Sequence, residues 1–140
     1  MEKLKQYESF FGYSFHGSEV PDGEYSVVIV GAEKGKSKND DPQLRLRLSV
    51  DEGDYRGAQF LKRYTINSEA SVSYFYRDVV LCGLQIHSLV SAFENHDLFV
   101  GLRLIVEKVT RGDWYSIYFR ELLEGKRYDT EHGGGNSDVV

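Results

Sequence analysis

The sequence is poor in cysteine and proline and has no long apolar run. Cys82 is the only cysteine among 140 residues, and there are two prolines. One cysteine excludes an internal disulfide, and its place in the apolar run 79–82 indicates a buried small side chain rather than a reactive thiol. No apolar run approaches the roughly 18 residues that a membrane span needs, and the first residues lack a signal-peptide pattern. We therefore expect a cytoplasmic protein without a membrane partner.

The sequence also lacks the motifs of common enzyme classes. It contains no GxSxG, HExxH, Walker A or Rossmann pattern. The four histidines, His16, His87, His96 and His132, lack the spacing of metal ligands. His87 and His96 flank the second predicted helix, and we interpret them as surface or capping residues, while His132 lies in the predicted tail. The acidic pairs at 40–41 and 51–54 lie in predicted turns, where acids are common turn formers. We predict a non-enzymatic protein with no metal and no cofactor.

The chain divides into three parts. Residues 1–23 form a lead-in, residues 24–123 carry regular periodicity, and residues 124–140 contain a glycine run that predicts a flexible tail. Apolar and β-branched residues predict strands at 24–32, 43–50, 59–66, 102–109 and 114–122. Helical spacing predicts helices at 68–83 and 88–95, the first with its apolar face on Val72, Phe75, Tyr76, Val79 and Val80. Gly83 is its predicted stop, and Gly31 marks either a bulge or a bend of a barrel strand.

The order of these elements predicts a fold. Three strands, a helical connection and two further strands (β-β-β-α-β-β) are typical of the five-stranded Greek-key barrel called the OB fold, an all-β barrel with a helical insert. A small α+β sandwich with the same element order is the alternative. In strand 43–50 the leucines alternate with Arg45 and Arg47, so one face is buried. In strand 59–66 both faces carry an apolar residue and a base, so the inward face stays open.

Basic and aromatic residues fall on the elements that bind oligonucleotides in OB folds. These elements are strands two and three, the loop between strands one and two, and the loop between strands four and five. Bases of a single strand stack on aromatic rings while Lys and Arg contact the phosphates. We predict phosphate contacts for the basic members and stacking for the aromatic members of one candidate set: Lys34, Lys36, Lys38, Arg45, Arg47, Phe60, Lys62, Tyr64, Arg111, Trp114, Tyr118 and Arg120.

The net charge of −5 argues against a nucleic-acid partner when it is taken over the whole chain. The excess of acids, however, belongs to the two ends, because residues 25–123 carry thirteen acids and thirteen bases. Several bases of this central part fall on the predicted binding elements. The net charge therefore does not exclude DNA, and it predicts modest affinity with a strong salt dependence.

Several motifs together also resemble a known family. A PDGEY segment at 21–25, an SKN loop at 37–39, the leucine strand at 44–50 and a YRG turn at 55–57 are similar to a family of small phage and prophage proteins of unknown function. The similarity covers roughly residues 20–85. That family is often proposed to consist of single-stranded DNA-binding proteins of phage DNA replication or recombination. The resemblance implies a sequence-tolerant single-stranded DNA-binding protein in the cytoplasm of a bacterial host cell.

Other functions stay open. The apolar end of the tail, Asp138, Val139 and Val140, is a candidate for recruiting replication or recombination proteins, although its acidic run is weak. A protein-interaction module, such as a phage factor that binds a host protein, suits the acidic charge and the aromatic content equally well. A catalytic OB-like domain would need a divalent metal held by Asp40, Asp41 or Asp54. A homo-oligomer is compatible with the sequence, since small single-strand binders gain affinity through multivalency.

Overall fold

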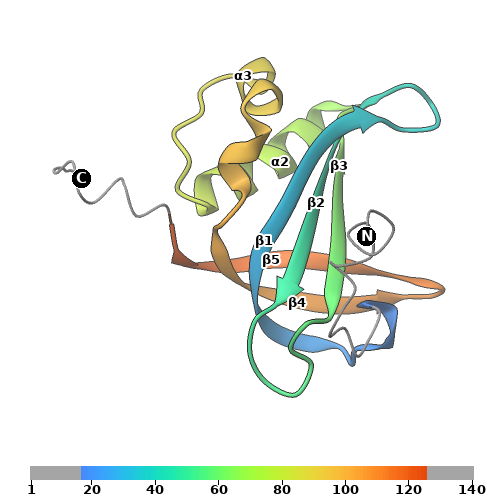
Figure 1. Cartoon of the computed structure of the whole chain (residues 1–140). Helices are drawn as coiled ribbons and strands as arrows, with labels where there is room; N and C mark the ends of the chain where they lie inside the picture. The colour runs from blue at the N-terminus through green and yellow to red at the C-terminus, as the bar shows by residue number, and fades with distance from the viewer. Residues whose placement is uncertain (1–16, 126–140) are drawn as a thin grey trace, which may run out of the picture.

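Five antiparallel strands form one sheet in the order β3-β2-β1-β4-β5. The computed structural model describes residues 17–125. Its elements are η2 (Gly17–Glu19), β1 (Gly23–Lys36), β2 (Pro42–Val50), β3 (Gln59–Thr65), α2 (Glu69–Leu81), α3 (Leu89–Glu94), η3 (His96–Phe99), β4 (Arg103–Arg111) and β5 (Trp114–Glu124). In Figure 1 the β4–β5 hairpin runs across the direction of β1, β2 and β3, and the helices lie at one end of the sheet. All five predicted strands and both predicted helices are confirmed.

The long strand β1 belongs to both halves of the sheet. Its first part pairs with β4 over residues 23–28, and its second part pairs with β2 over residues 27–36. The register shifts between Ile29 and Gly31, which confirms the predicted bulge. A bulge bends a strand and increases its twist, so β1 can turn from one partner to the other.

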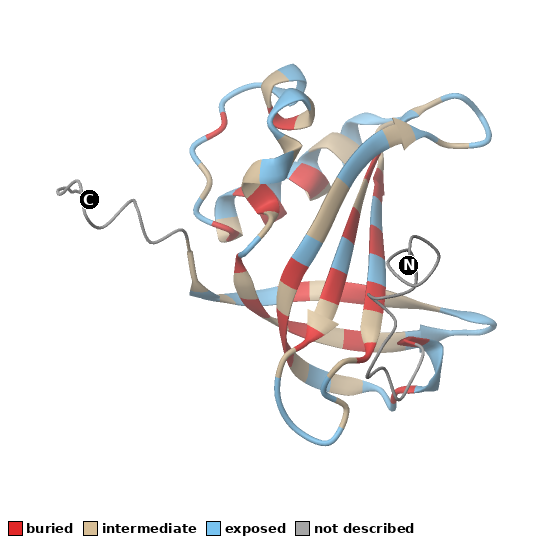
Figure 2. Cartoon of the chain, viewed as in Figure 1, coloured by how far each residue is buried: buried red, intermediate tan, exposed pale blue. Residues whose placement is uncertain are grey.

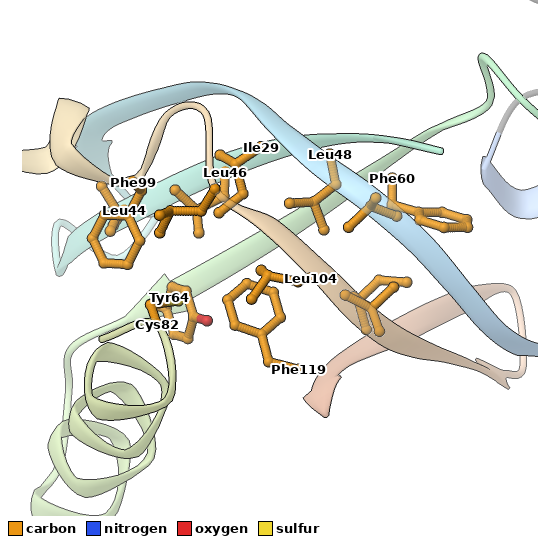
Figure 3. Packing of buried hydrophobic residues seen from close by; sticks show 14 of the residues in the cluster. Ile29, Leu44, Leu46, Leu48, Phe60, Tyr64, Cys82, Phe99, Leu104 and Phe119 are labelled. Atoms are coloured by element: carbon orange, nitrogen blue, oxygen red, sulfur yellow. The ribbon is translucent and has the colours of Figure 1, made fainter. Parts of the chain in front are cut away.

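The core lies on the inner face of this bent sheet. The leucines of β2 are fully buried while Arg47 is exposed, as the alternation predicts. Figure 2 shows this alternation along the strands, and Figure 3 shows how Leu46, Leu104 and Phe119 meet from different strands. Cys82 is buried in the same cluster, and burial raises the pKa of its thiol to about 12, which confirms it as a core side chain.

The inward face of β3, which the sequence left open, carries Phe60, Lys62 and Tyr64. All three are buried, whereas Leu61 and Arg63 are exposed. The face includes a lysine because its ammonium finds polar partners inside the molecule, which are described below. Hydropathy alone could not choose this face.

Helix α2 begins and ends as predicted, but its buried face differs. Ser68 caps the N-terminus through a hydrogen bond from the Ser71 amide, and Gly83 follows the helix with a positive φ of 72°. Phe75 and Val79 are buried as expected. Tyr76 and Val80 are 60% and 55% exposed, and Asp78 is buried in their place, which corrects the predicted face. The physical reason is that the Asp78 carboxylate has partners on β3.

The predicted barrel is not confirmed. β3 and β5 are the two edges of the sheet, and no backbone ladder joins them within residues 17–125. Two side chains connect these edges instead. The Leu61 amide donates to the Tyr115 hydroxyl (3.1 Å), and the Lys62 amine donates to the Ile117 carbonyl. The fold is therefore a mostly β protein with one five-stranded antiparallel sheet and a few helices.

The tail residues Asp138, Val139 and Val140 and most of the lead-in lie outside the described residues. Among the helices of residues 17–125, none combines the length and the apolar character that crossing a membrane requires.

We predict that Phe60→Ala lowers the free energy of unfolding by about 3–5 kcal/mol, because it leaves a cavity in the core. Leu61→Ala, on the exposed face of the same strand, should cost less than about 1 kcal/mol. Urea unfolding of the two variants measures both values. Equal losses, or a larger loss for Leu61→Ala, would contradict the assigned inward face of β3.

Candidate nucleic-acid interface

A groove of about 480 Å³ lies between the edge strands β3 and β5. Four aromatic rings line it, those of Tyr74, Trp114, Tyr115 and Tyr118. Two bases, Lys62 and Arg63, also line it, and none of the described residues at its surface is acidic. In a chain with a net charge of −5, this groove is locally basic.

The outer face of β2 and β3 continues the groove with arginines. Arg45 and Arg63 are direct cross-strand partners, and Arg47 lies opposite Leu61. Like charges at directly opposed positions destabilise a sheet unless something neutralises them. Arg45 lies 3.5 Å from the largely exposed Glu33 carboxylate, whereas Arg47 and Arg63 have no ion pair among the described residues.

The guanidinium groups of Arg45 and Arg47 extend over β1. A Cβ atom at Gly31 would come within 2.7 Å of Arg47 Nη2, and one at Gly35 within 2.6 Å of Arg45 Nη2. Both glycines therefore leave the space that these side chains occupy. The exposed carboxylate of Glu33 lies between the two glycines on β1.

The turn between β4 and β5 presents the largest exposed aromatic side chain. Trp114 is 66% exposed and lies opposite Arg111 in the hairpin. The ring of Tyr118 lies between two guanidinium groups, with its centroid 5.7 Å from Arg111 Cζ and 5.3 Å from Arg120 Cζ. A hydrogen bond from Arg111 lowers the pKa of Tyr118 and fixes its ring. Arg120 is also bound to the Glu107 carboxylate (Nε to Oε1, 3.0 Å).

The structure does not bring the three predicted lysines to the arginine face. Lys34 pairs with Leu44, so it lies on the face opposite to Arg45. Lys36 is the last residue of β1 and forms an exposed ion pair with Asp40 (3.5 Å), and Lys38 follows in the exposed loop. In Figure 1 this loop and the tip of the β4–β5 hairpin extend toward the same side of the view.

Three other predicted site residues are buried. Phe60 and Tyr64 are 1% and 3% exposed, and the Tyr64 hydroxyl donates to Asp78 Oδ2 (2.7 Å). Their rings are packed in the core, so a base cannot stack on them in this conformation. Lys62 is also buried, and its side chain lines the groove from the interior of the protein. These three positions correct the prediction that their side chains contact DNA directly.

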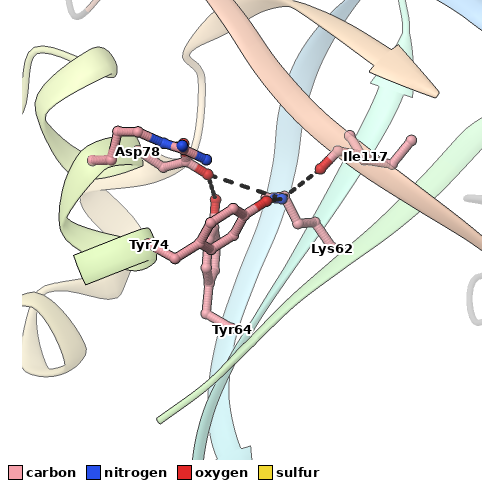
Figure 4. A network of polar contacts seen from close by, with 6 residues as sticks. Lys62, Tyr64, Tyr74, Asp78 and Ile117 are labelled. Carbon is pink, nitrogen blue, oxygen red and sulfur yellow. Dashed lines mark hydrogen bonds and ion pairs between the residues drawn. The ribbon is translucent and has the colours of Figure 1, made fainter. Parts of the chain in front are cut away.

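The buried ammonium of Lys62 holds β3, β5 and α2 together (Figure 4). It donates to the Tyr74 hydroxyl (2.9 Å) and to the Ile117 carbonyl, and it lies 3.9 Å from Asp78 Oδ2. Four ring centroids lie 4.9–5.9 Å from Nζ, those of Tyr64, Tyr74, Tyr118 and Phe119. Burial lowers the pKa of Lys62 to about 8, and the nearby carboxylate of Asp78 opposes this effect. Burial likewise raises the pKa of Asp78.

Sequence reasoning predicted only Lys62, Trp114 and Tyr118 among the residues that line the groove, and it missed Arg63 and Tyr74 among others. Arg63 was left unassigned because the inward face of β3 was open. Tyr74 lies on α2 outside the predicted apolar face, but it is one turn before Asp78, and this spacing of a tyrosine and an acid was the available signal. Within residues 17–125, no three His, Cys, Asp or Glu side chains are arranged to hold a metal ion.

Fold and surface together define a small, mostly β protein with a basic, aromatic groove between its two edge strands. The chain belongs to the family described as protein of unknown function (DUF669), whose family profile matches residues 12–122. This agrees with the resemblance to an uncharacterised family, and the family description carries no function. No curated protein matches the chain.

We predict that the contribution of Lys62 to the free energy of unfolding rises with pH above about 8. The pKa of its amine is about 8 in the folded protein and near 10.5 when unfolded, so the unfolded chain holds more protons between these values. The cost of burying the charge is present below pH 8 and is relieved as the pH rises. The expected gain between pH 7 and pH 10 is roughly 2 kcal/mol.

Urea unfolding of the wild type and of Lys62→Met at pH 7, 8, 9 and 10 measures this contribution. The difference between the two proteins should change with pH, while Lys38→Met, at an exposed loop lysine, should follow the wild type. A constant difference between wild type and Lys62→Met across this range would show that Lys62 does not titrate there.

Proposed function

We propose that the protein binds single-stranded DNA with little sequence preference and acts in phage DNA replication or recombination. The observation that carries the proposal is the groove between β3 and β5, with four aromatic rings, the exposed Arg63 and no acid among its described residues. Proteins that bind single strands combine these features, because the nucleobases stack on aromatic rings while the side chains of Lys and Arg follow the phosphates.

The exposed residues have distinct roles in this proposal. Trp114 and Tyr118 stack bases, and each stacked base contributes roughly 1–3 kcal/mol. Arg63 and the neighbouring Arg45 and Arg47 contact phosphates along the outer face of β2 and β3. Arg111 and Arg120 extend the basic surface past Tyr118 at the other side of the groove. The lysines at 34, 36 and 38 contact a longer strand at its end.

The strand order supports an OB-like fold for this function. A five-stranded Greek-key barrel that lacks the ladder between its third and fifth strands has the order β3-β2-β1-β4-β5, which is the order found here. OB folds are partly open barrels, and they bind oligonucleotides on strands two and three and on the loops one–two and four–five. We therefore propose an OB-like barrel that is open between β3 and β5.

The phage context rests on the PDGEY, SKN and YRG motifs. It places the proposed activity in the cytoplasm of a bacterial host cell. Recruitment of replication or recombination proteins by Asp138, Val139 and Val140 remains a prediction that belongs to this proposal.

A second candidate function is binding of a protein partner. An apolar hollow of about 260 Å³ lies beside α3, lined by Pro42, Ile66, Leu89, Val90, Phe93 and Glu94. Val90 is 66% exposed. Apolar surface of this kind is typical of protein docking sites. A Val90→Asp variant that binds DNA normally but no longer binds a replication or host protein would support this second function.

We predict that oligo(dT) quenches the fluorescence of Trp114, which is the only tryptophan in the sequence. The logarithm of the binding constant should fall with the logarithm of salt concentration, with a slope of about −0.7 per neutralised phosphate. Arg63→Ala should weaken binding about five- to tenfold and reduce that slope by about one phosphate.

Arg56→Ala is the matched control, because it removes the same charge from an exposed turn outside the groove. It should leave both affinity and slope nearly unchanged. Absence of binding at low salt, or equal effects of Arg63→Ala and Arg56→Ala, would contradict the proposed function and its site.

A further inference from the structure

The edge of β3 that faces the groove exposes backbone groups. In this strand the even-numbered residues bond to β2, as the bonds from the Ile66 amide to the Pro42 carbonyl and from the Val50 amide to the Ala58 carbonyl establish. The amides and carbonyls of Leu61 and Arg63 therefore point away from β2. They face the groove, which Leu61 and Arg63 line.

Side chains cap this edge at one position and leave the next one open. The Leu61 amide donates to the Tyr115 hydroxyl at 3.1 Å. On the opposite edge, the Ile117 carbonyl accepts a hydrogen bond from Lys62. The Arg63 amide, two residues further along β3, has no hydrogen-bond partner among residues 17–125. An unpaired amide in a groove is a donor that a ligand can use.

The caps also decide which ligand fits. Another peptide strand would need a continuous row of free amides and carbonyls to form a ladder. Here Tyr115 and Lys62 already occupy one group on each edge, so such a ladder would have to displace the buried Lys62 ammonium. A planar ligand that offers a single acceptor atom needs only one free amide, so it can bind without displacing the Lys62 ammonium.

The walls of the groove favour a flat group from an anionic chain. The rings of Tyr74 and Tyr118 are held in place, because Lys62 donates to the hydroxyl of Tyr74 and Arg111 to that of Tyr118. Ring faces attract planar bases, and the acid-free surface suits the phosphates on either side of a base.

We propose that this groove holds one nucleobase of the bound strand, stacked on the tyrosine side and accepting a hydrogen bond from the Arg63 amide. The inference rests on the proposed function and goes beyond it, since it assigns one base-binding subsite within an otherwise sequence-tolerant surface. It follows that the bases of a bound oligonucleotide contribute unequally to affinity.

An abasic scan tests the subsite. The scan uses the shortest oligo(dT) that retains full affinity for the full-length protein, because this oligonucleotide can bind in one register only. A single abasic site is moved along it, and the affinity at each position is measured by fluorescence anisotropy. One position should cost about tenfold, which is the loss of one stacked base. Ser116→Leu fills the groove, and it should reduce that penalty to about twofold or less. Ser73→Leu, on the exposed side of α2, should keep the full penalty.

A pair of variants at one position tests the hydrogen bond. Arg63→Ala and Arg63→Pro both remove the guanidinium, but only proline removes the amide hydrogen, and prolines are tolerated on edge strands. Arg63→Pro should bind about five- to tenfold more weakly than Arg63→Ala. Urea unfolding checks that both variants fold. If Arg63→Pro does not fold, the abasic scan with Ser116→Leu tests the subsite instead.

The outcomes separate the two proposals. If the wild type binds no oligonucleotide, the proposed function itself fails. If the wild type binds but every abasic position costs the same, or Ser116→Leu keeps the uneven profile, the subsite is wrong while the proposed function stands.

Discussion

The fold and its groove depend on one buried cation, the ammonium of Lys62. A backbone ladder would bring β3 and β5 to the spacing of paired strands, about 4.8 Å. Here the ammonium bonds to the Ile117 carbonyl and the Tyr74 hydroxyl beside the Asp78 carboxylate, so a long side chain spans the distance instead. The strands are connected and yet remain apart. The groove lies where Lys62, together with Tyr115, connects the two edges in place of a ladder.

This arrangement explains why the candidate surface combines rings with bases. The edge strands turn their outer residues toward the groove, and on β5 these are Trp114 and Tyr118, while on β3 they include Arg63. On the neighbouring strand β2, Arg45 lies directly beside Arg63, and neither β2 nor β3 contains an acidic residue. The acids that give the chain its negative charge are concentrated at its two ends. A chain that is acidic overall can therefore present a basic surface to an anionic strand.

Local patterns in the sequence were sufficient for most of the secondary structure. The alternation of leucines with arginines determined both faces of β2, and Ser68 and Gly83 marked the ends of α2. The same reasoning could not determine the inward face of β3. Burying the charge of Lys62 costs free energy unless the ammonium has polar partners, and the sequence pattern does not reveal those partners. Those partners come from α2 and β5, more than ten residues away in sequence. The missing ladder was unpredictable for the same reason, since it depends on this long-range bond.

We propose that a single DNA strand passes along the groove between β3 and β5. Photo-crosslinking of an oligo(dT) that carries 5-bromodeoxyuridine, followed by mass spectrometry of the digested protein, tests this path. We expect crosslinks at the groove aromatics, foremost Trp114 and Tyr118. Crosslinks confined to the opposite surface of α2 and α3, around Tyr76 and Val90, would contradict the account, as would an absence of crosslinks under conditions in which the oligonucleotide binds.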